Sequence, residues 1–334
     1  MNPGIPVPPV LYGGIERVVY LLAEEYHQMG HEVTLLAGNG SYCSGTTITF
    51  GGSDAKKTKW VVYKEIYFVW KFLKKNHNNF DLVHNFGRLI YLLPIVGKPV
   101  AKLMCYQREV SARGIKMISS LPVRRLIFTA CSNYGVSTGN VAGVWKTVYN
   151  TINFSTYKLT EQAGADAPLI FLGRLDRIKG AHTAIQVAKQ TNNTLIIAGN
   201  IPDTEDNFNY YKNELEPLLD GEQIIYIGAV DDHKKNEYLG KAKALLFPIE
   251  WDEPFGIVMI EAMACGTPVI AFKRGSVPEV VDADTGFIVN DADEMAGAVG
   301  LINTIDRKKC RLKAEARFNT AAIAKEYLSI FDFA

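Results

Sequence analysis

The sequence predicts an α/β protein with two doubly wound domains of comparable size. The chain has 334 residues, about twice the length of a typical domain. Short β-branched runs alternate with amphipathic stretches, which is typical of parallel βαβ units. This alternation stops in the polar stretch 153–168, which indicates a linker, and then begins again. We expect a first domain at residues 1–153, a second at 166–317, and a C-terminal helix, 318–334, that joins the first domain.

The expected elements follow in order along each half of the chain. A helix is expected at about residues 15–29, where it ends before Gly30. The strands of the first half are expected at 31–37, 46–50, 81–84, 99–105, 126–130 and 147–149. Those of the second half are expected at 169–172, 194–198, 224–227, 244–247 and 268–272, with helices between them. Ligands bind such sheets at the carboxyl ends of the strands, so we expect a site in a cleft between the domains.

The start of the first domain departs from this pattern. A doubly wound domain normally begins with a buried central strand ahead of its glycine turn. Here twelve residues precede Gly13, and four of them are proline, which donates no ladder hydrogen bond. A central strand is therefore not expected within residues 1–12. Either the domain folds without it, or the natural reading frame extends upstream and encodes a short apolar strand. In-frame stop codons immediately before Met1 would exclude the second explanation.

The composition excludes several classes of partner. The 36 basic and 35 acidic residues give a net charge of +1, which offers no general electrostatic basis for binding nucleic acid. The five cysteines are scattered and form no C-x-x-C pair, so we expect no metal site and a reducing compartment. The N-terminus shows no signal-peptide pattern, and no apolar run reaches membrane-spanning length. We therefore expect a cytoplasmic protein.

Two cations follow the first strand of the second domain. Arg174 leaves the end of this strand, and Lys179 starts the next helix. Both side chains can converge on the cleft, where an arginine fork and a lysine charge are typical ligands of phosphate. In the alternative interpretation, Arg174 pairs with a structural carboxylate and Lys179 is solvated.

Two glutamates, Glu253 and Glu261, bracket a turn that opens an apolar helix. Glu253 precedes a proline and should lie outside the helix, whereas Glu261 projects from the helix body. Between them, backbone N–H groups near Phe255, Gly256 and Ile257 lack intrahelical partners and suit an anionic, hydroxyl-rich ligand. Glycosidases also place two carboxylates near a sugar, but they need neither the cation pair nor a helix N-terminus directed at phosphate. A hydrolase is therefore disfavoured.

A Gly-Gly pair, Gly13-Gly14, opens the first helix of the chain. Glycines at this position let the backbone approach a ligand closely, and the unpaired N–H groups of a helix start favour phosphate. The alternative is an ordinary loop before a helix.

Together these segments resemble family 4 glycosyltransferases. The resemblance rests on Gly-Gly-x-Glu before the first helix, Gly-Arg-x4-Lys-Gly after the linker, and Glu-x7-Glu with Glu-Ala-Met-Ala-Cys-Gly-Thr-Pro-Val-Ile-Ala. It covers the chain from Gly13 onward and is strongest from Leu169 to Val289. Members of this family are retaining, nucleotide-sugar-dependent enzymes of the GT-B fold, in which two Rossmann-like domains face each other across a cleft. The resemblance implies the same fold and activity here.

The resemblance also implies a role for each matching residue. Arg174 and Lys179 would hold the diphosphate of the donor and stabilise the leaving nucleoside diphosphate, with no metal or other cofactor. Glu253 would contact hydroxyl groups of the donor sugar, and Glu261 those of the ribose. The remaining donor contacts would come from the backbone, at Gly13, Gly14, Val230, Phe255, Gly256 and Ile257.

One departure concerns histidine. Many family members carry a histidine just after the strand that corresponds to residues 99–105, but here the chain continues Tyr106-Gln107-Arg108. His84 is the nearest candidate for a sugar or acceptor contact. A histidine that ends a buried strand is more often a structural hydrogen-bonding residue, so both interpretations of His84 stay open, as does the identity of the sugar.

The segment 59–75 is basic and aromatic with a helical period. Such a helix can lie on an anionic membrane surface, which would place the protein at the inner face of a membrane through a weak peripheral contact. The alternative is a helix packed on the first-domain sheet with solvated lysines. Apolar residues nearly surround the helix, which favours packing.

The resemblance leads to a hexosyltransferase that uses a nucleotide-diphosphate sugar, with UDP as the expected nucleotide. Its acceptor, whether a small molecule, a glycan or a lipid-linked compound, is not identified by the sequence. Two alternatives stay open. One is a nucleotide-sugar epimerase of the same fold, although such enzymes lack the Glu-x7-Glu segment. The other is a nucleotide-sugar-binding protein without turnover.

Overall fold

The computed structural model describes residues 1–10, 13–52, 58–108, 110 and 112–332. By their contacts, residues 1–151 and 320–334 form one compact unit, unit 1, and residues 152–319 form another, unit 2. The boundaries at 151 and 319 differ by two residues from those expected, at 153 and 317. Tyr12, which precedes the Gly-Gly pair, and the last two residues of the expected helix 318–334 lie outside the described residues.

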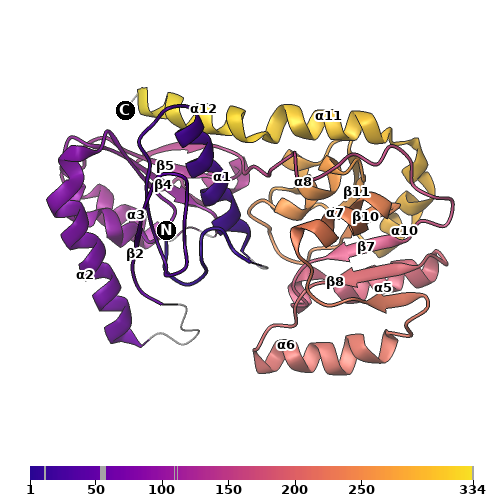
Figure 1. The fold of residues 1–334 in the computed structure, drawn as a ribbon. Coiled ribbons are helices and arrows are strands. Elements are labelled where there is room, and N and C mark those ends of the chain that lie inside the picture. Colours follow the sequence, from indigo (N-terminus) through magenta and orange to yellow (C-terminus); the bar gives the residue numbers. More distant parts are fainter. Residues whose placement is uncertain (11–12, 53–57, 109, 111, 333–334) are drawn as a thin grey trace. The chain divides into compact units, whose positions relative to one another are not determined.

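Unit 2 is built on a six-stranded parallel sheet with the order β12-β11-β10-β7-β8-β9. Figure 1 labels four of these strands, β11, β10, β7 and β8. The strands are β7 (Leu169–Leu172), β8 (Leu195–Ala198), β9 (Ile224–Tyr226), β10 (Ala244–Phe247), β11 (Val269–Phe272) and β12 (Gly286–Val289). The first strand, β7, lies in the middle, with β8 and β9 on one side and β10 to β12 on the other. The direction of winding therefore reverses between β7 and β10.

Helices complete unit 2. They are α5 (Ala181–Gln190), α6 (Glu205–Tyr210), α7 (Asp232–Lys241), α8 (Ile257–Ala264), α9 (Val277–Val280), α10 (Ala292–Leu301) and α11 (Arg307–Phe318), with the short turn η3 (Arg177–Lys179) before α5. All four residues of β10 are buried, as are the first three of β7 and β11. Continuous apolar runs of this kind are expected for parallel strands that are covered on both faces.

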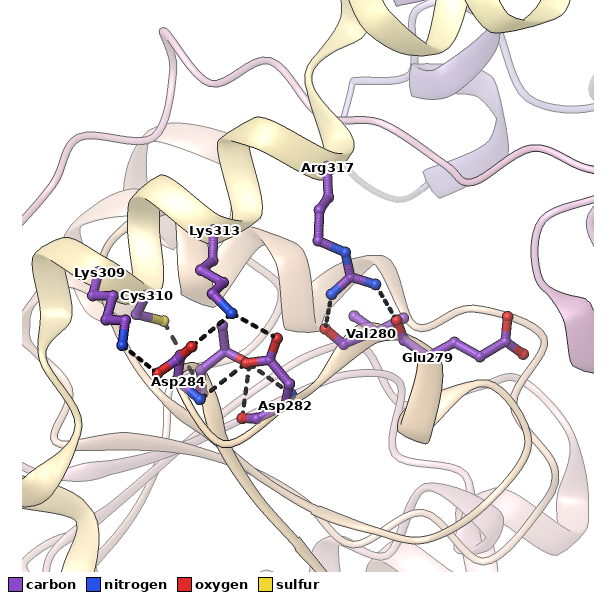
Figure 2. Close-up of polar contacts among 9 residues, drawn as sticks. Glu279, Val280, Asp282, Asp284, Lys309, Cys310, Lys313 and Arg317 are labelled. Carbon is purple, nitrogen blue, oxygen red and sulfur yellow. Dashed lines mark hydrogen bonds and ion pairs between the residues drawn. The ribbon is translucent and has the colours of Figure 1, made fainter.

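Helix α11 is tied to the segment between α9 and β12 by polar contacts (Figure 2). The Lys313 ammonium lies 2.6 Å from Asp284 and 3.5 Å from Asp282, and Lys309 lies 2.6 Å from the other oxygen of Asp284. Arg317 donates hydrogen bonds to two backbone carbonyl groups of α9. These contacts hold the last helix of unit 2 across residues that lie about 30 positions earlier in the chain.

The sequence predicted a linker at 153–168. This prediction is wrong for the first part of the segment, which packs into unit 2. Tyr157 is buried, and the Thr160 N–H donates to the Cys265 carbonyl at 3.0 Å. Arg307 and Arg311 of α11 donate to the carbonyl groups of Thr160, at 2.7 Å, and of Tyr157, at 2.6 Å. The segment has no apolar period because distant arginine side chains, and not a strand or helix of its own, satisfy its backbone.

Unit 1 contains two separate parallel sheets. The larger has the order β3-β4-β5-β6, and the smaller pairs β1 with β2. Their strands are β1 (Thr34–Ala37), β2 (Thr46–Thr49), β3 (Leu82–Asn85), β4 (Ala101–Tyr106), β5 (Leu126–Ala130) and β6 (Val144–Thr147). As expected, the described residues 1–10 contain no strand. The strand expected at 147–149 begins three residues earlier, because pairing with β5 places Val144 opposite Ile127.

The helices of unit 1 are α1 (Gly14–Gln28), α2 (Lys59–Asn76), α3 (Ala112–Ser119), α4 (Asn133–Gly139) and α12 (Thr320–Asp332), with the short turns η1 (His77–Asn79) and η2 (Leu89–Ile95). Helix α12 contacts α1 and brings Tyr327 into the core. Among the described helices, none combines the length and the hydropathy needed to cross a membrane.

Helix α2 packs on the core of unit 1 along one side only. Val69 and Leu73 are buried on this side. Trp60, Tyr63 and Tyr67 are 77%, 63% and 66% exposed, so the packing that the sequence favoured leaves these three aromatic side chains uncovered. Apolar residues lie nearly all around the helix, whereas the core covers only one of its faces.

Candidate functional site

The candidate site lies in unit 2 where the strand order reverses. Parallel strands present their carboxyl ends at one edge of the sheet, and open α/β sheets bind ligands at that edge where the winding changes direction. In unit 2 this point is flanked by the loops 173–180, after β7, and 248–256, after β10. The first loop carries Arg174 and Lys179, and the second carries Glu253.

Lys179 and Glu253 contact each other directly. The lysine Nζ lies 2.6 Å from Oε2 of the glutamate, and the two side chains are only 17% and 14% exposed. Trp251 Nε1 donates to the same oxygen at 3.0 Å, and the Lys179 ammonium lies 5.0 Å from the centre of the Trp251 ring. An ammonium has three N–H donors, so Lys179 can keep Glu253 and still donate to an anion above it. Neither this pair nor Trp251 was predicted from the sequence.

Arg174 forms an ion pair with Asp176, two residues further along the same loop. The Asp176 side chain is 7% exposed and that of Arg174 is 38% exposed. The pairing with a structural carboxylate that the sequence left open is therefore present. Arg174 can still donate to a ligand, because a guanidinium has five N–H donors and a single carboxylate does not use all of them.

Two glycines bring the loops of the site together. Gly180 has φ 77°, and a Cβ at this position would lie 2.0 Å from the carbonyl oxygen of Pro248. Gly275, in the loop after β11, has φ 51°, and its Cβ would lie 2.4 Å from the Glu253 carbonyl oxygen. The Ser276 N–H donates to that oxygen at 2.9 Å. The Glu253 loop is thus held against its neighbours by contacts that only glycine permits.

Helix α8 begins directly after this loop. Its N-cap, Gly256, has φ 77° and supplies no side-chain cap, so the N–H groups of the first turn are not satisfied by a capping side chain. The positive end of the helix dipole therefore lies at Ile257. Phe255 is buried, and its ring lies 5.8 Å from that of Phe318, edge to face. Phe255 can therefore offer a ligand only its backbone.

Glu261 lies in the body of α8 and is 4% exposed. Its Oε1 accepts hydrogen bonds from the Tyr157 hydroxyl at 2.7 Å and from Lys235 Nζ at 2.8 Å. Lys235 belongs to α7, and Tyr157 belongs to the segment expected to be a linker. The two donors hold the carboxylate in one orientation. No local pattern around Glu261 indicated them, since both are distant in the sequence.

Val230 lies between β9 and α7 and is 8% exposed. The loop turns at Gly228, with φ 75°, and Asp231 caps α7 by accepting from the Lys234 N–H at 2.8 Å. Because the side chain of Val230 is buried, a ligand here would meet mainly backbone groups.

The Gly-Gly pair belongs to unit 1. Gly13 is the N-cap of α1, with φ 146°, and Gly14 is the first helical residue. A Cβ on Gly13 would lie 2.7 Å from the Pro9 Cβ. Glu16 of the first turn is buried, and this burial raises its pKa. The close packing of Gly13 explains the glycine, and its contact with a donor stays a prediction.

His84 is held by polar and aromatic neighbours within unit 1. Its Nδ1 lies 3.3 Å from the Tyr26 hydroxyl, and its Nε2 lies 2.8 Å from Cys105 Sγ. The rings of Phe86 and Tyr327 both have their centres 4.5 Å from that of the imidazole. Burial lowers the pKa of His84 to about 3, so the ring is neutral. These contacts match the structural interpretation of His84.

The cysteines of the chain are free thiols. Among the described residues, no group of three or more His, Cys, Asp or Glu side chains is arranged to hold a metal ion.

Comparisons with known proteins define the class of this fold and site. The model described as Glycosyl transferases group 1 matches residues 160–324, and the model described as Glycosyltransferase Family 4 matches residues 12–100. Solved glycosyltransferases of the GT-B fold match almost the whole chain. The protein is therefore a glycosyltransferase enzyme of the GT-B fold, and it belongs to family 4.

Individual relatives are distant. An uncharacterized 41.2 kDa protein in the cps region of Klebsiella pneumoniae is 26% identical over 292 residues, or 76% of this chain and 79% of that protein. Alpha-maltose-1-phosphate synthase of Mycolicibacterium smegmatis is 31% identical over 48% of this chain and 46% of that protein. A phosphatidyl-myo-inositol mannosyltransferase of Propionibacterium freudenreichii is 29% identical over 42% of this chain and 35% of that protein. With these last two, the match spans less than half of the relative.

Solved structures share the fold at low identity. Sucrose-phosphate synthase from Thermosynechococcus elongatus has a TM-score of 0.80 at 20% identity, over 100% of this chain and 99% of that one. AviGT4, a glycosyltransferase involved in avilamycin A biosynthesis, has a TM-score of 0.74 at 22% identity, over 98% and 92% of the two chains. Anabaena Alr3699/HepE, solved with UDP and glucose, has a TM-score of 0.76 at 17% identity, over 100% and 98%.

Proposed function

We propose that the protein transfers a hexosyl group from a nucleoside diphosphate sugar, with UDP as the nucleotide, to an acceptor hydroxyl with retention of configuration. The observation that carries this proposal is the Lys179–Glu253 pair at the reversal point of the sheet, beside the uncapped start of α8. A cation, a carboxylate and a helix N-terminus at one place suit a ligand that combines phosphate with hydroxyl groups.

The diphosphate of the donor would be held by three positive groups. Lys179 offers its remaining N–H donors, Arg174 offers a guanidinium, and α8 offers its first-turn amides from Gly256 onward. Each cation has a carboxylate partner, Glu253 or Asp176. These carboxylates hold the cations in position, so that little reorganisation would accompany donor binding.

The hydroxyl groups of the donor would meet the glutamates. Glu253, held by Lys179 and Trp251, would accept from hydroxyl groups of the sugar, and Glu261 would accept from the ribose. Glu261 is held by Tyr157 and Lys235, so its orientation does not depend on the ligand. The backbone around Val230 would meet the base.

In the proposed reaction, the acceptor oxygen bonds to the anomeric carbon on the face from which the diphosphate departs. The bond between the anomeric carbon and the phosphate oxygen breaks, and its electron pair leaves with the nucleoside diphosphate. A phosphate oxygen of the donor takes the acceptor proton. The chain would contribute positioning and stabilisation of the departing charge, with no metal, and not a two-carboxylate mechanism.

The relatives support the donor class, whereas the acceptor stays open. HepE, which shares the fold, has been solved with UDP and glucose and with UDP-glucose. The mannosyltransferase and the maltose-1-phosphate synthase are named for different products, so the family serves several acceptors. A small molecule, a glycan or a lipid-linked compound are all compatible with the site in unit 2.

Donor binding and transfer can be tested in sequence. A thermal-shift screen over nucleotides and nucleotide sugars identifies the donor, because a ligand of the folded state raises Tm by mass action. Transfer and donor hydrolysis are then measured for Arg174→Ala, Lys179→Ala and Glu261→Ala. We expect kcat/KM to fall by about 100-fold or more for the two cation variants, since each removes a charge that faces the leaving group.

The matched control is Lys241→Ala, which removes an exposed lysine from α7. It should leave kcat/KM unchanged. Undiminished transfer by the three site variants would refute the assignment. Product NMR with donor alone distinguishes a transferase from an epimerase, because an epimerase converts the donor sugar without an acceptor. Calorimetric binding of the donor without turnover across an acceptor panel would instead indicate a binding protein.

A further inference from the structure

A cavity of about 610 Å³, lined mostly by apolar residues, lies in unit 1. Strands β1 and β3, one from each sheet, line it with Leu35 and Val83. Helices α1 and α2 line it as well, with Leu22 and Leu73. The cavity is therefore bordered by the edges of two sheets and by helices, which is the environment of a central strand in a doubly wound domain.

Both bordering strands lie at sheet edges. β3 ends the four-stranded sheet, and β1 is one of the two strands of the smaller sheet. An edge strand presents a row of backbone N–H and C=O groups that a further strand can pair with. Because both sheets are parallel, one strand between β1 and β3 would join them into a single parallel sheet.

Unit 2 shows the arrangement that such a strand would create. With one strand inserted between β1 and β3, the order in unit 1 becomes β2-β1-strand-β3-β4-β5-β6. This matches the order β9-β8-β7-β10-β11-β12 of unit 2, with one further strand at the edge. The inserted strand takes the place of β7, which is largely buried and precedes the glycine-containing loop and first helix of its unit.

Met1 already makes a contact of the ladder type. Its amino nitrogen donates to the carbonyl oxygen of Leu36, in β1, at 2.9 Å. In the parallel pairs of unit 2, a residue donates to the carbonyl one position before its partner, as Leu169 does to Thr194. By this rule Met1 is in register with Ala37, and three preceding residues would be in register with the rest of β1.

The buried position of the Met1 amino group disfavours its charged form. Burial lowers the pKa of this group to about 5. A peptide N–H at the same position has no charged form and would make the same hydrogen bond to Leu36.

We propose that this cavity takes an extended apolar strand that runs parallel between β1 and β3 and continues through Met1. The strand is apolar because side chains on both of its faces would meet apolar walls, such as Leu22 of α1 and Leu73 of α2. Its length is set by β1, whose four residues would pair with Met1 and three residues before it. This inference does not depend on the proposed function.

The test joins short segments to the nitrogen of Met1. One chain carries Met-Val-Ile-Val ahead of Met1, and the matched control carries Met-Ser-Asp-Ser, which has the same length and cannot fill an apolar cavity. We expect the apolar segment to raise Tm by at least about 5 °C over the control, since it buries three large side chains and adds ladder hydrogen bonds. Amide hydrogen exchange should slow by about tenfold or more in β1 and β3, and stay unchanged in β6 at the far edge.

A second measurement uses the unextended chain. It should bind the dye ANS, which reports accessible apolar surface, and the apolar segment should abolish this binding while the polar control does not. Equal Tm values for the two extended chains, or unchanged exchange in β1 and β3, would overturn the proposal. Loss of a cooperative transition with the apolar segment would also contradict it. Decanoate is tested on the unextended chain. If it slowed amide exchange in β1 and β3 to the same extent as the apolar segment does, the cavity would be a site for any apolar molecule and not for a strand.

Discussion

Replacement of Lys179 and Glu253, singly and together, separates their contribution to stability from their contribution to catalysis. Lys179→Met removes the cation and keeps most of the apolar stem, and Glu253→Gln removes the charge and keeps a hydrogen-bond acceptor for Trp251. Each single variant leaves one charge in a site where the side chains are only 17% and 14% exposed. The double variant leaves neither.

The expected cost lies between two limits. An exposed ion pair contributes about 0–1 kcal/mol to stability, and loss of one partner from a buried pair costs about 3–5 kcal/mol. Because Lys179 and Glu253 keep a small part of their exposure, we expect each single variant to lose about 2 kcal/mol. For a unit of this size, such a loss lowers Tm by about 4–8 °C.

The double variant should lose about 1–2 kcal/mol less than the sum of the two single variants, because no unpaired charge remains. Urea unfolding measures this coupling. Activity should behave differently: kcat/KM stays low in the double variant, since the cation that faces the leaving diphosphate is still absent. The matched control is the exposed pair Lys241–Glu237 of α7, for which we expect no measurable coupling.

Two results would refute this reasoning. If the losses of the two single variants simply add, the side chains do not interact as the 2.6 Å contact requires. If activity returns together with stability in the double variant, Lys179 acts only through the fold, and its proposed role at the diphosphate is wrong.

Three further predictions concern the rest of the chain. Burial lowers the pKa of Lys102 from 10.5 to about 8, so the unfolded chain binds more protons between these values and stability rises with pH in this window. In urea unfolding at about pH 8 and about pH 10, Lys102→Met should show a smaller rise than the unmodified chain, and an equal rise would contradict this. Gly180→Ala should lower Tm and transfer activity because its Cβ would meet the Pro248 carbonyl, whereas Gly297→Ala, in open space within α10, should raise Tm slightly. Asp284→Asn should lower Tm by a small amount that disappears at high salt, since its partners on α11 are exposed (Figure 2); a loss independent of salt would argue against an electrostatic origin.

Much of the secondary structure follows from local patterns. The strands at 126–130, 169–172 and 244–247 were predicted with the boundaries that the structure has, because each is a mainly apolar run that is largely buried. The strand at 147–149 was misplaced by three residues, because its register depends on β5 and not on its own sequence. The segment 153–168 was misjudged for a related reason, since Arg307 and Arg311 satisfy its backbone from more than 140 positions away.

The candidate site shows the same division. Arg174, Lys179, Glu253 and Glu261 were predicted as site residues, because they follow strand ends or a helix start in a pattern that resembles a known family. The contacts that orient them were not predicted. Glu261 is held by Lys235 and Tyr157, which come from different elements, and sequence spacing carries no information on such contacts.

The sequence by itself therefore determined the α/β class, most strand positions, the family and the side chains that would carry the chemistry. These depend on local periodicity and on short motifs, in which neighbouring residues act together. Only the tertiary structure decided that Lys179 and Glu253 form a pair, that Tyr26 and Cys105 hold His84, and that a cavity separates β1 from β3. These features arise from contacts between segments that are distant in the chain, and the folded backbone alone brings such segments together.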